Sequence, residues 1–412
     1  MTSLTHLNLS HTGFRGKIPP QIGNLSNLVY LDLSYVFANG TVPSQIGNLS
    51  KLRYLDLSDN DFEGMAIPSF LCAMTSLTHL DLSSGFMGKI PSQIGNLSNL
   101  IYLDLGGNYL LAENVEWVSS MWKLEYLDLS YANLSLLNFT GNEIQGPIPG
   151  GIRNLTLLQN LELSFNSFSS SIPNCLYGLH RLKYLDLSSS NLHGTISDAL
   201  GNLTSLVGLD LSHNQVEGTI PTSLGNLTSL VELDLSYNQL EGTIPTFLGN
   251  LRNSREIDLK YLYLSINKFS GNPFESLGSL SKLSSLLING NNFQGVVNED
   301  DLANLTSLKE FDASGNNFTL KVGPNWLPNF QLSYLDVTSW QIGPNFPSWI
   351  QSQNKLRYVG LSNTGILDSI PTWFWEAHSQ DKPMQLEFLN LASNNLSGEI
   401  PDCWINWPFL VD

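Results

Sequence analysis

The chain has 412 residues, of which 13% are charged and 42% are apolar, a composition typical of a folded protein and not of a disordered tail. Its formal net charge of −17 and its pI near 4.7 exclude nucleic acid and an anionic membrane surface as expected partners. A basic or neutral protein, peptide or glycan remains compatible with this charge. The three cysteines, Cys72, Cys175 and Cys403, are too widely separated for a disulfide framework or a metal site, so we expect small apolar fillers.

The amino-terminal sequence MTSLTHLNLSH has neither the basic region nor the apolar region of a signal peptide. No stretch of the chain approaches the roughly 18 to 20 apolar residues of a membrane span. The sequence therefore predicts neither a signal peptide nor a transmembrane helix in these 412 residues.

From this terminus onward, a motif of the form LxxLxL recurs about every 24 residues and is followed in many copies by an Asn three residues later. This is the leucine-rich-repeat pattern, in which alternate strand residues point inward and each repeat, or rung, is stable only beside its neighbours. The copies begin at Leu4, Leu28, Leu52, Leu77, Leu100, Leu124, Leu158, Leu182, Leu206, Leu230, Leu259, Leu283, Leu308, Leu332, Leu356 and Leu386, with a doubtful seventeenth at Leu134. We therefore expect an α/β solenoid, a horseshoe of about 16–17 repeats with a parallel concave β-sheet, running as one continuous domain over residues 1–412.

The spacing slips near residues 130–142, 254–262 and 376–386. In the first slip, LEYLDLSYANLSLLNFT places two strand motifs only ten residues apart, which is too short for one turn of the solenoid. Because LEYLDLS fits the strand template better, we expect residues 124–130 to keep their place in the sheet and residues 132–140 to bulge out. A lost segment of about 14 residues, alone or with whole repeats, would explain this junction.

The same residue types recur in the turn that follows each strand motif, so we expect the same turn structure in each rung. The recurring Asn can satisfy backbone groups as the chain leaves the strand, which favours a stacked structural ladder. The sequence GxIP follows, as at Gly16, Gly88, Gly146, Gly218 and Gly242, where Gly permits a bend and Pro sets an extended backbone. This LxGxIPxxLGNLxxL form resembles the plant extracellular leucine-rich repeats.

The segment VGPNWLPNFQLSYLDVTSWQIGPNFPSWIQSQNKLRYVGLSNTGILDSIPTWFWEAHSQ sharpens the resemblance. It is similar to the corresponding part of plant receptor-like proteins of the ethylene-inducing-xylanase receptor group. The resemblance implies a plasma-membrane receptor without a kinase, facing the extracellular side, that binds a microbial or developmental ligand and signals through receptor-kinase co-receptors.

The family resemblance also implies capping segments at both ends, and we expect both caps to be missing here, as in a truncated chain. Capping repeats cover the apolar cross-section of a solenoid. We therefore expect the isolated chain to self-associate, and a monodisperse monomer in light scattering would contradict this expectation.

Two columns of side chains are expected on the concave face. Aspartates between the inward leucines would stack about 4.8 Å apart and repel by roughly 0.9 kcal/mol even in bulk water, which would raise their pKa values and attract cations. Tyrosines two positions earlier suit either ligand recognition or stacking that stabilises the sheet, and both interpretations stay open. The candidate ligand-binding residues are Tyr30, Asp32, Tyr54, Asp56, Tyr102, Asp104, Tyr126, Asp128, Tyr184, Asp186, Tyr334 and Asp336, together with Trp340.

Trp340 stands where the Asn ladder is expected, in the irregular part of the chain after residue 320 where we look for specificity, and is predicted to be an exposed anchor. The sequence also contains N-x-S/T motifs four residues before a rung leucine, which would line one flank if glycosylated. Alternatively, GNLS and GNLT are repeat consensus that matches by chance. These candidates are Asn24, Asn48, Asn96, Asn154, Asn202, Asn226 and Asn304.

We expect no enzyme, cofactor or metal site, because the sequence has no phosphate-binding loop, kinase motif, HExxH or GxSxG. The favoured function is the ligand-recognition ectodomain, or a fragment of one, of a plant receptor-like protein in defence or development, binding an extracellular protein or peptide. The alternatives are a secreted inhibitor of a microbial cell-wall hydrolase, similar to the polygalacturonase-inhibiting leucine-rich proteins, and a truncated gene product without a function of its own.

Overall fold

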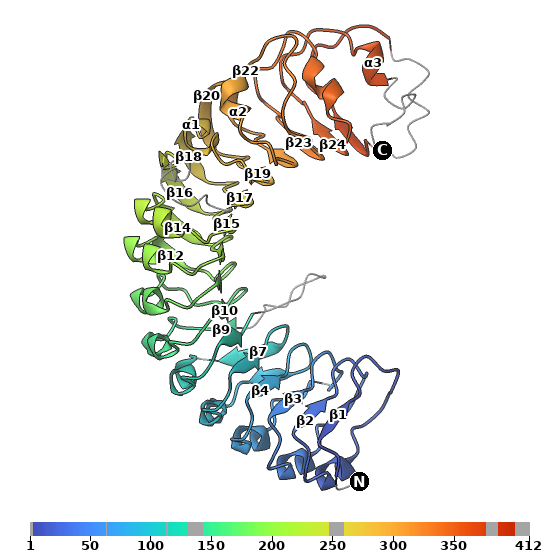
Figure 1. Ribbon diagram of the computed structural model, residues 1–412, viewed down its shortest axis with the longest axis vertical. Coiled ribbons are helices and arrows are strands. Elements are labelled where there is room, and N and C mark those ends of the chain that lie inside the picture. Colours follow the sequence, from blue (N-terminus) through green and yellow to red (C-terminus); the bar gives the residue numbers. More distant parts are fainter. Residues whose placement is uncertain are drawn as a thin grey trace. The chain divides into compact units, whose positions relative to one another are not determined.

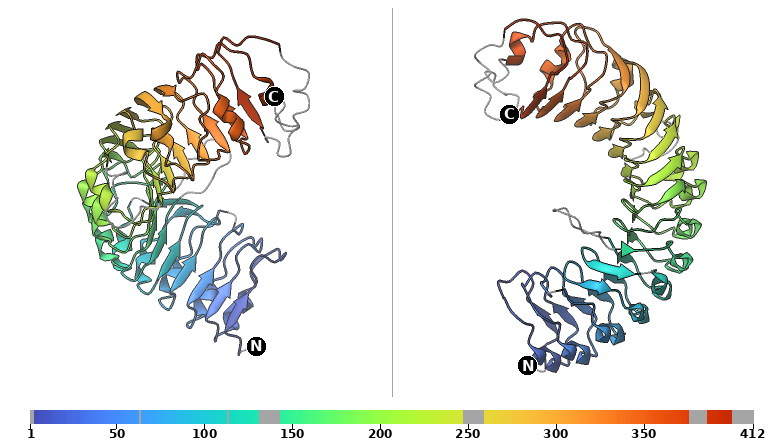
Figure 2. Two further views of the ribbon diagram at one scale, coloured as in Figure 1. Left: turned by 45° about the horizontal axis from the view of Figure 1, so that its top comes forward. Right: turned by 180° about the vertical axis from the view of Figure 1, so that it is seen from behind.

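A computed structural model describes residues 3–62, 64–112, 114–130, 143–246, 259–375 and 386–399 of the protein. Its contacts divide the chain into two compact units, Met1–Gln215 (unit 1) and Val216–Asp412 (unit 2). In each unit a parallel sheet forms one side, and short helical segments lie on the opposite side (Figures 1 and 2). This arrangement confirms the predicted leucine-rich-repeat solenoid with a parallel sheet.

Each rung contributes one short strand to the main sheet, and neighbouring strands are parallel and in register, so that Leu31 lies opposite Leu55. Successive strand residues point to opposite faces, so the leucines enter the core, where both are fully buried. In unit 1 the strands are β1 (His6–Asn8), β2 (Tyr30–Asp32), β3 (Tyr54–Asp56), β4 (His79–Asp81), β6 (Tyr102–Asp104), β8 (Tyr126–Asp128), β10 (Asn160–Glu162), β11 (Tyr184–Asp186) and β13 (Gly208–Asp210). In unit 2 they are β15 (Glu232–Asp234), β17 (Tyr261–Tyr263), β19 (Ser285–Leu287), β21 (Glu310–Asp312), β23 (Tyr334–Asp336), β24 (Tyr358–Gly360) and β25 (Phe388–Asn390).

The Asn ladder closes each turn after a main-sheet strand, as predicted. The side-chain amide of Asn60 donates to the carbonyls of Leu33 at 2.8 Å and Leu57 at 3.0 Å, and its Oδ1 accepts from the backbone N–H of Ala38 at 2.9 Å. One buried side chain thus satisfies backbone groups of two rungs, which would otherwise be costly to leave unpaired.

The GxIP segment turns the chain into the flank. Gly218 has φ of 80°, which glycine adopts without steric cost, and Pro221 has the extended values φ −69° and ψ 141°. The next apolar residue, Leu224, enters the core from the middle of a short helix. These helices are η1 (Pro20–Asn24), η2 (Ser44–Asn48), η3 (Ser69–Ala73), η4 (Ser92–Asn96), η5 (Glu116–Ser120), η6 (Gly150–Asn154), η7 (Asn174–Gly178) and η8 (Asp198–Asn202) in unit 1, and η9 (Thr222–Asn226), α1 (Phe274–Leu277), α2 (Glu299–Leu302), η11 (Ser348–Ser352) and α3 (Thr372–Trp375) in unit 2.

Short additional strands form between the main sheet and these helices. Unit 1 has a sheet of β5 (Met87–Lys89), β7 (Tyr109–Ala112) and β9 (Glu143–Ile144), together with β12 (His193–Thr195). In unit 2 the additional strands are β14 (Gln215–Gly218, starting at the last residue of unit 1), β16 (Gln239–Gly242), β18 (Lys268–Gly271), β20 (Asn292–Asn298) and β22 (Asn317–Lys321). They use backbone groups that the turns would otherwise leave unpaired.

Each of the three spacing slips is a single long rung among the described strands. The β8 strand pairs with β6 on one side and β10 on the other, which confirms that the 124–130 rung keeps its place in the sheet. In the other two slips, Glu232 lies opposite Tyr261 and Tyr358 lies opposite Phe388, again in register. The predicted bulge at residues 132–140 and the doubtful rung at Leu134 lie outside the described residues.

The first rung of unit 1 exposes apolar side chains that are covered in later rungs. Leu7 and Leu9 are half-buried and line a hollow of about 440 Å³, whereas the equivalent Leu31 and Leu33 are 0% and 4% exposed. Phe14, also in the lining, is 61% exposed. This apolar opening is consistent with the expected self-association, which stays a prediction.

Candidate ligand-binding site

The predicted aspartate column lies on the face of the main sheet that is turned away from the leucine core, called here the open face. Its carboxylates are nevertheless almost buried, and Asp56 is 9% exposed. The Oδ1 atom of Asp56 accepts from the backbone N–H and the hydroxyl of Ser58 at 3.0 and 2.7 Å, and Oδ2 accepts from the Tyr54 hydroxyl at 3.4 Å. Asp32 makes the same three bonds. The carboxylate oxygens therefore already accept hydrogen bonds from donors within the protein, and little of their surface is left for a ligand.

Burial is the main reason why the pKa values in this column rise. It raises the pKa of Asp81 to about 6 and that of Asp104 to about 8, and the charges of Asp128 and Asp81 on either side raise the pKa of Asp104 further. Burial also raises the pKa of Asp56 and Asp312. The rise was expected from repulsion along the column, but loss of water around each carboxylate is the larger cause.

The tyrosine column of unit 1 forms a continuous stack of rings from β2 to β8. The Tyr30 and Tyr54 ring centroids lie 4.1 Å apart, His79 continues the stack 4.0 Å from Tyr54, and Tyr102 and Tyr126 lie 4.3 Å apart. Burial lowers the pKa of His79 to about 4, so its ring is neutral at pH 7. In these rungs the geometry favours stacking that stabilises the sheet over a role in ligand binding.

The candidate tyrosines elsewhere lie in different surroundings. Tyr184 is 46% exposed because its neighbours in the column are Asn160 and Gly208, which have no ring to stack on it. In unit 2, Tyr334 stacks on Tyr358 at 4.2 Å, and the Tyr358 hydroxyl donates to Oδ2 of Asp336 at 3.2 Å. In unit 1, Oδ1 of Asp186 and of Asp128 accepts from the backbone N–H of a serine two residues later.

The prediction that Trp340 is an exposed anchor is wrong. Its side chain is 1% exposed and packs on Phe318, with ring centroids 4.7 Å apart. Its Nε1–H donates to the Ala313 carbonyl at 2.9 Å, across one rung, as the amide of Asn316 does to the Ile288 carbonyl at 3.0 Å. The indole therefore replaces the ladder Asn because it supplies a donor of similar reach, and its large ring fills the core.

A group of exposed and half-buried apolar side chains in unit 2 was missed from the sequence. We call Tyr237, Tyr261, Tyr263, Ile266 and Leu287 the unit 2 apolar patch. Tyr263 and Leu287 occupy column positions between Asp234 and Asp312, where they interrupt the carboxylates. Tyr237, Tyr261 and Ile266 are 48%, 38% and 41% exposed. The break in the aspartate column was the sequence signal that identifies these rungs.

Two members of the unit 2 apolar patch have an unfavourable backbone conformation. Tyr237 and Ile266 both have φ of 53°, in the left-handed region that β-branched and bulky residues rarely adopt. Glycine takes this turn position in the next two rungs, at Gly290 and Gly315. A Cβ added to Gly290 would lie 2.5 Å from Cδ1 of Ile266, so the absence of a side chain there makes room for Ile266. Large apolar side chains are thus held exposed at a position where they do not help the turn.

The seven flank asparagines lie at equivalent places on the side opposite the main sheet. Six of them are the last residue of a short helix, as Asn24 is in η1, and Asn304 follows α2. All seven are exposed. Each of these asparagines is therefore accessible to solvent on one flank of its own unit, and their glycosylation stays a prediction.

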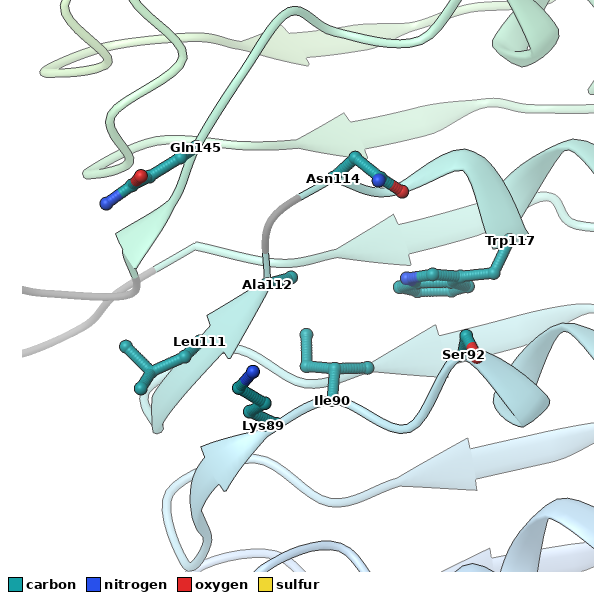
Figure 3. Close-up of a pocket in the computed structure, with 8 residues that line it drawn as sticks. All are labelled: Lys89, Ile90, Ser92, Leu111, Ala112, Asn114, Trp117 and Gln145. Carbon is teal, nitrogen blue, oxygen red and sulfur yellow. The ribbon is translucent and has the colours of Figure 1, made fainter.

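Unit 1 also carries a small hollow of about 380 Å³ between β7 and η5 (Figure 3). Leu111 and Ala112 come from β7, and the indole of Trp117 extends toward them from η5. The Nε1–H of Trp117 is buried, and no acceptor among the described residues takes its hydrogen. The hollow therefore suits a ligand that has one hydrogen-bond acceptor flanked by apolar groups.

Among the described residues, no group of three or more His, Cys, Asp or Glu side chains is placed to hold a metal ion. None of the helices in the described ranges is long and apolar enough to cross a membrane.

Comparison with known families agrees with this fold. The family described as leucine-rich repeat region matches residues 169–364, and the single leucine-rich repeat matches residues 3–25, 51–74, 133–155, 157–179 and 385–407. The chain belongs to the leucine-rich-repeat proteins.

Within that class, the similar curated proteins are plant receptor-like proteins, which confirms the predicted resemblance to the ethylene-inducing-xylanase receptor group. Receptor-like protein EIX1 of Solanum lycopersicum is 39% identical over 109 residues, which cover 26% of this chain and 10% of that protein. Receptor-like protein EIX2 of the same organism is 35% identical over a segment of the same length and coverage. The match thus spans about a tenth of each curated relative.

Similar solved structures cover nearly the whole chain. A TDR receptor superimposes with a TM-score of 0.82 at 31% identity, over 99% of this chain and 67% of that one. The ectodomain of the Arabidopsis receptor kinase HAESA, in complex with an extended IDA peptide hormone, gives 0.80 at 30% identity, over 96% and 63%. HAESA with IDA and the co-receptor SERK1 gives 0.64 at 28% identity, over 98% and 76%.

Proposed function

We propose that this chain is the ligand-recognition part of a plant cell-surface receptor-like protein, which binds an extracellular peptide or protein on the open face of unit 2. The observation that carries the proposal is the unit 2 apolar patch. The similarity to receptor ectodomains supports it, because the HAESA ectodomain is described in complex with a peptide hormone. We propose a role in defence or developmental signalling, and the similarity to receptor-like proteins supports a signalling role.

The chemistry of the unit 2 apolar patch suits peptide recognition. Tyrosine offers a large apolar area and a hydroxyl, and loses little conformational entropy on binding. Tyr237 and Tyr261 are exposed, whereas Tyr54 and Tyr102 are stacked on both faces. A ligand that covers the patch removes exposed apolar area from water, which is the main driving force of most protein association.

The rest of the proposed assembly follows from the same relatives. A receptor-kinase co-receptor would contact the bound ligand, as the structure of HAESA with IDA and the co-receptor SERK1 suggests for that receptor. Glycans on Asn24, Asn48, Asn96, Asn154, Asn202, Asn226 and Asn304 would occupy one flank and leave the open face to the ligand. The location is the extracellular face of the plasma membrane, by resemblance.

The experiment selects binders from a library of random linear peptides on the full 412-residue chain and measures the enriched peptides by calorimetry. Tyr261→Ala and Ile266→Gly should each weaken binding about tenfold or more, because a few apolar anchors carry most binding energy. Ile266→Gly is the sharper variant, since glycine suits the left-handed turn and should leave the free energy of unfolding equal or higher.

The matched control is Tyr35→Gly, at the same turn position in unit 1, where Tyr35 has φ of 53° and is 46% exposed. It should leave the affinity of the selected peptides unchanged. Failure to enrich any peptide, or loss of affinity only in the Tyr35 variant, would refute the proposed site.

A further inference from the structure

We propose that a lysine-lined pocket at the edge of the main sheet in unit 2 binds an acidic, extended segment of the peptide ligand. The inference rests on the proposed function, because it assigns the chemistry of part of the ligand. An acidic ligand differs from the basic or neutral partners that are compatible with the net charge of the whole chain.

The pocket has a volume of about 600 Å³ and is lined by Lys260, Lys282, Lys309 and Lys355, with Tyr261 of the unit 2 apolar patch in the same wall. All four lysines are exposed. The chain has only 19 lysines and arginines against 36 aspartates and glutamates, so four cations around one hollow depart from its general charge. None of the described residues that line the pocket is acidic.

The sheet holds the lysine backbones in place and leaves the side chains at the surface. The Lys309 carbonyl accepts from the Ser333 N–H at 2.7 Å, and the Lys260 carbonyl accepts from the Ser284 N–H at 2.8 Å. The nearby guanidinium of Arg357 is paired with Glu387. Glu310 lies next to Lys309 on β21, and its Oε2 accepts from the Ser285 hydroxyl at 2.9 Å.

The remaining lining is polar and favours a hydrophilic ligand with donors as well as charges. Ser284, Thr306, Asn329 and Gln331 contribute hydroxyl and amide groups. The Oε1 atom of Gln331 is buried and accepts from none of the described groups, while its Nε2 donates to the Ser352 carbonyl at 2.9 Å. A peptide supplies both carboxylates for the lysines and N–H groups for such acceptors.

The spacing of the lysines fits an extended peptide. They come from the rungs that begin at Leu259, Leu283, Leu308 and Leu356, with one rung between the last two. Five rungs span roughly 19 Å at about 4.8 Å per strand, and an extended chain of six residues covers a similar length at about 3.3 Å per residue. Alternate residues share one face, so such a segment would present about three carboxylates to the lysines.

The test measures binding of a blocked hexapeptide in which Glu alternates with Ser to the full 412-residue chain, by calorimetry at low ionic strength. The peptide with Gln in place of Glu should not bind. The double variant Lys309→Glu and Lys355→Glu should weaken binding at least about tenfold, and raising the salt should weaken it in the unmodified chain, because exposed charges are screened.

The matched control is Lys183→Glu with Lys51→Glu, which makes the same change of charge at the same two rung positions in unit 1. Lys183 follows its rung leucine as Lys309 does, and Lys51 precedes its leucine as Lys355 does. The control should change affinity less than about twofold, the scale of a screened effect on distant charges. An equal loss in both double variants would show a general charge effect and overturn the assignment.

Two other outcomes separate this inference from the proposed function. Binding of an oligosaccharide of uronic acids with the same lysine dependence, in the absence of hexapeptide binding, would replace the peptide with an acidic glycan and overturn the inference. Library peptides that need Tyr261 and Ile266 but are insensitive to the lysine variants would leave the proposed function intact and refute only the lysine pocket.

Discussion

Replacing Trp340 tests whether this side chain is part of the core, as the structure shows, or a binding anchor, as its place in the sequence predicts. We expect Trp340→Ala to destabilise unit 2 strongly. The ring is 1% exposed and lies against Phe318, Phe311 and Phe274, with centroid distances of 4.7, 6.0 and 6.5 Å.

The magnitude follows from packing more than from the lost hydrogen bond. Truncating a buried aromatic residue to Ala costs about 3–5 kcal/mol through lost burial and the cavity that remains. The Ala313 carbonyl keeps a second donor, the Asn316 amide at 3.0 Å, so losing the indole donor adds only about 0.5–1.5 kcal/mol. Trp340→Phe keeps most of the ring and should cost roughly 1–2 kcal/mol. Trp122→Ala, at a side chain that is 54% exposed, should cost less than about 1 kcal/mol.

Urea unfolding followed by circular dichroism measures these differences, and hydrogen exchange localises them. Because repeats interact mainly with their neighbours, loss of protection should concentrate in the rungs around β21, β23 and β24. If Trp340→Ala unfolds at the same urea concentration as the unmodified chain but weakens peptide binding, the packing argument is refuted and the original anchor prediction is right.

Burial raises the pKa of Asp104 to about 8, so the folded state holds its proton more tightly than the unfolded chain does; its stabilising contribution is present below about pH 4 and is lost as the pH rises through 8. Asp104→Asn should therefore stabilise the chain at pH 9 and have little effect at pH 4, and a stability difference between the two proteins that does not change with pH would contradict this. When the chain is secreted from a plant cell, glycans should add mass that a glycosidase removes. This added mass should fall stepwise as the seven flank asparagines are changed to Gln. A secreted chain of unmodified mass would show that the motifs are repeat consensus only. Light scattering of the purified chain should show self-association through the apolar hollow at Leu7 and Leu9, and a monodisperse monomer would rule it out.

The repeat pattern was sufficient to predict the local structure of almost every described rung. Leucine at alternate strand positions can be buried in only one register, because a shift by one residue would turn the whole set to solvent. This is why the rung at Leu124 keeps its place despite the slip that follows it. The turn chemistry was equally local, since Asn60 and Gly218 act on backbone groups within one or two rungs.

The candidate site was harder to predict because exposure depends on neighbouring rungs. Tyr54 and Tyr184 stand at the same motif position, but Tyr54 is stacked between two rings, whereas Tyr184 lies between Asn160 and Gly208 and is exposed. The repeat pattern also predicted that Trp340 is exposed at the surface, because the ladder Asn is absent at that position. An indole can replace that amide, and only the packed aromatic side chains around it show that it does.

The sequence by itself determined the solenoid, its register, its turns and its resemblance to receptor-like proteins, because all of these depend on residues within one repeat and its copy in the next. Tertiary structure alone decided which polar and aromatic groups remain for a ligand. The carboxylates bond to hydroxyls of their own rung, but packing of the rungs leaves a side chain such as Asp56 only 9% exposed. The same stacking brings together four lysines that are scattered over nearly a hundred residues of chain.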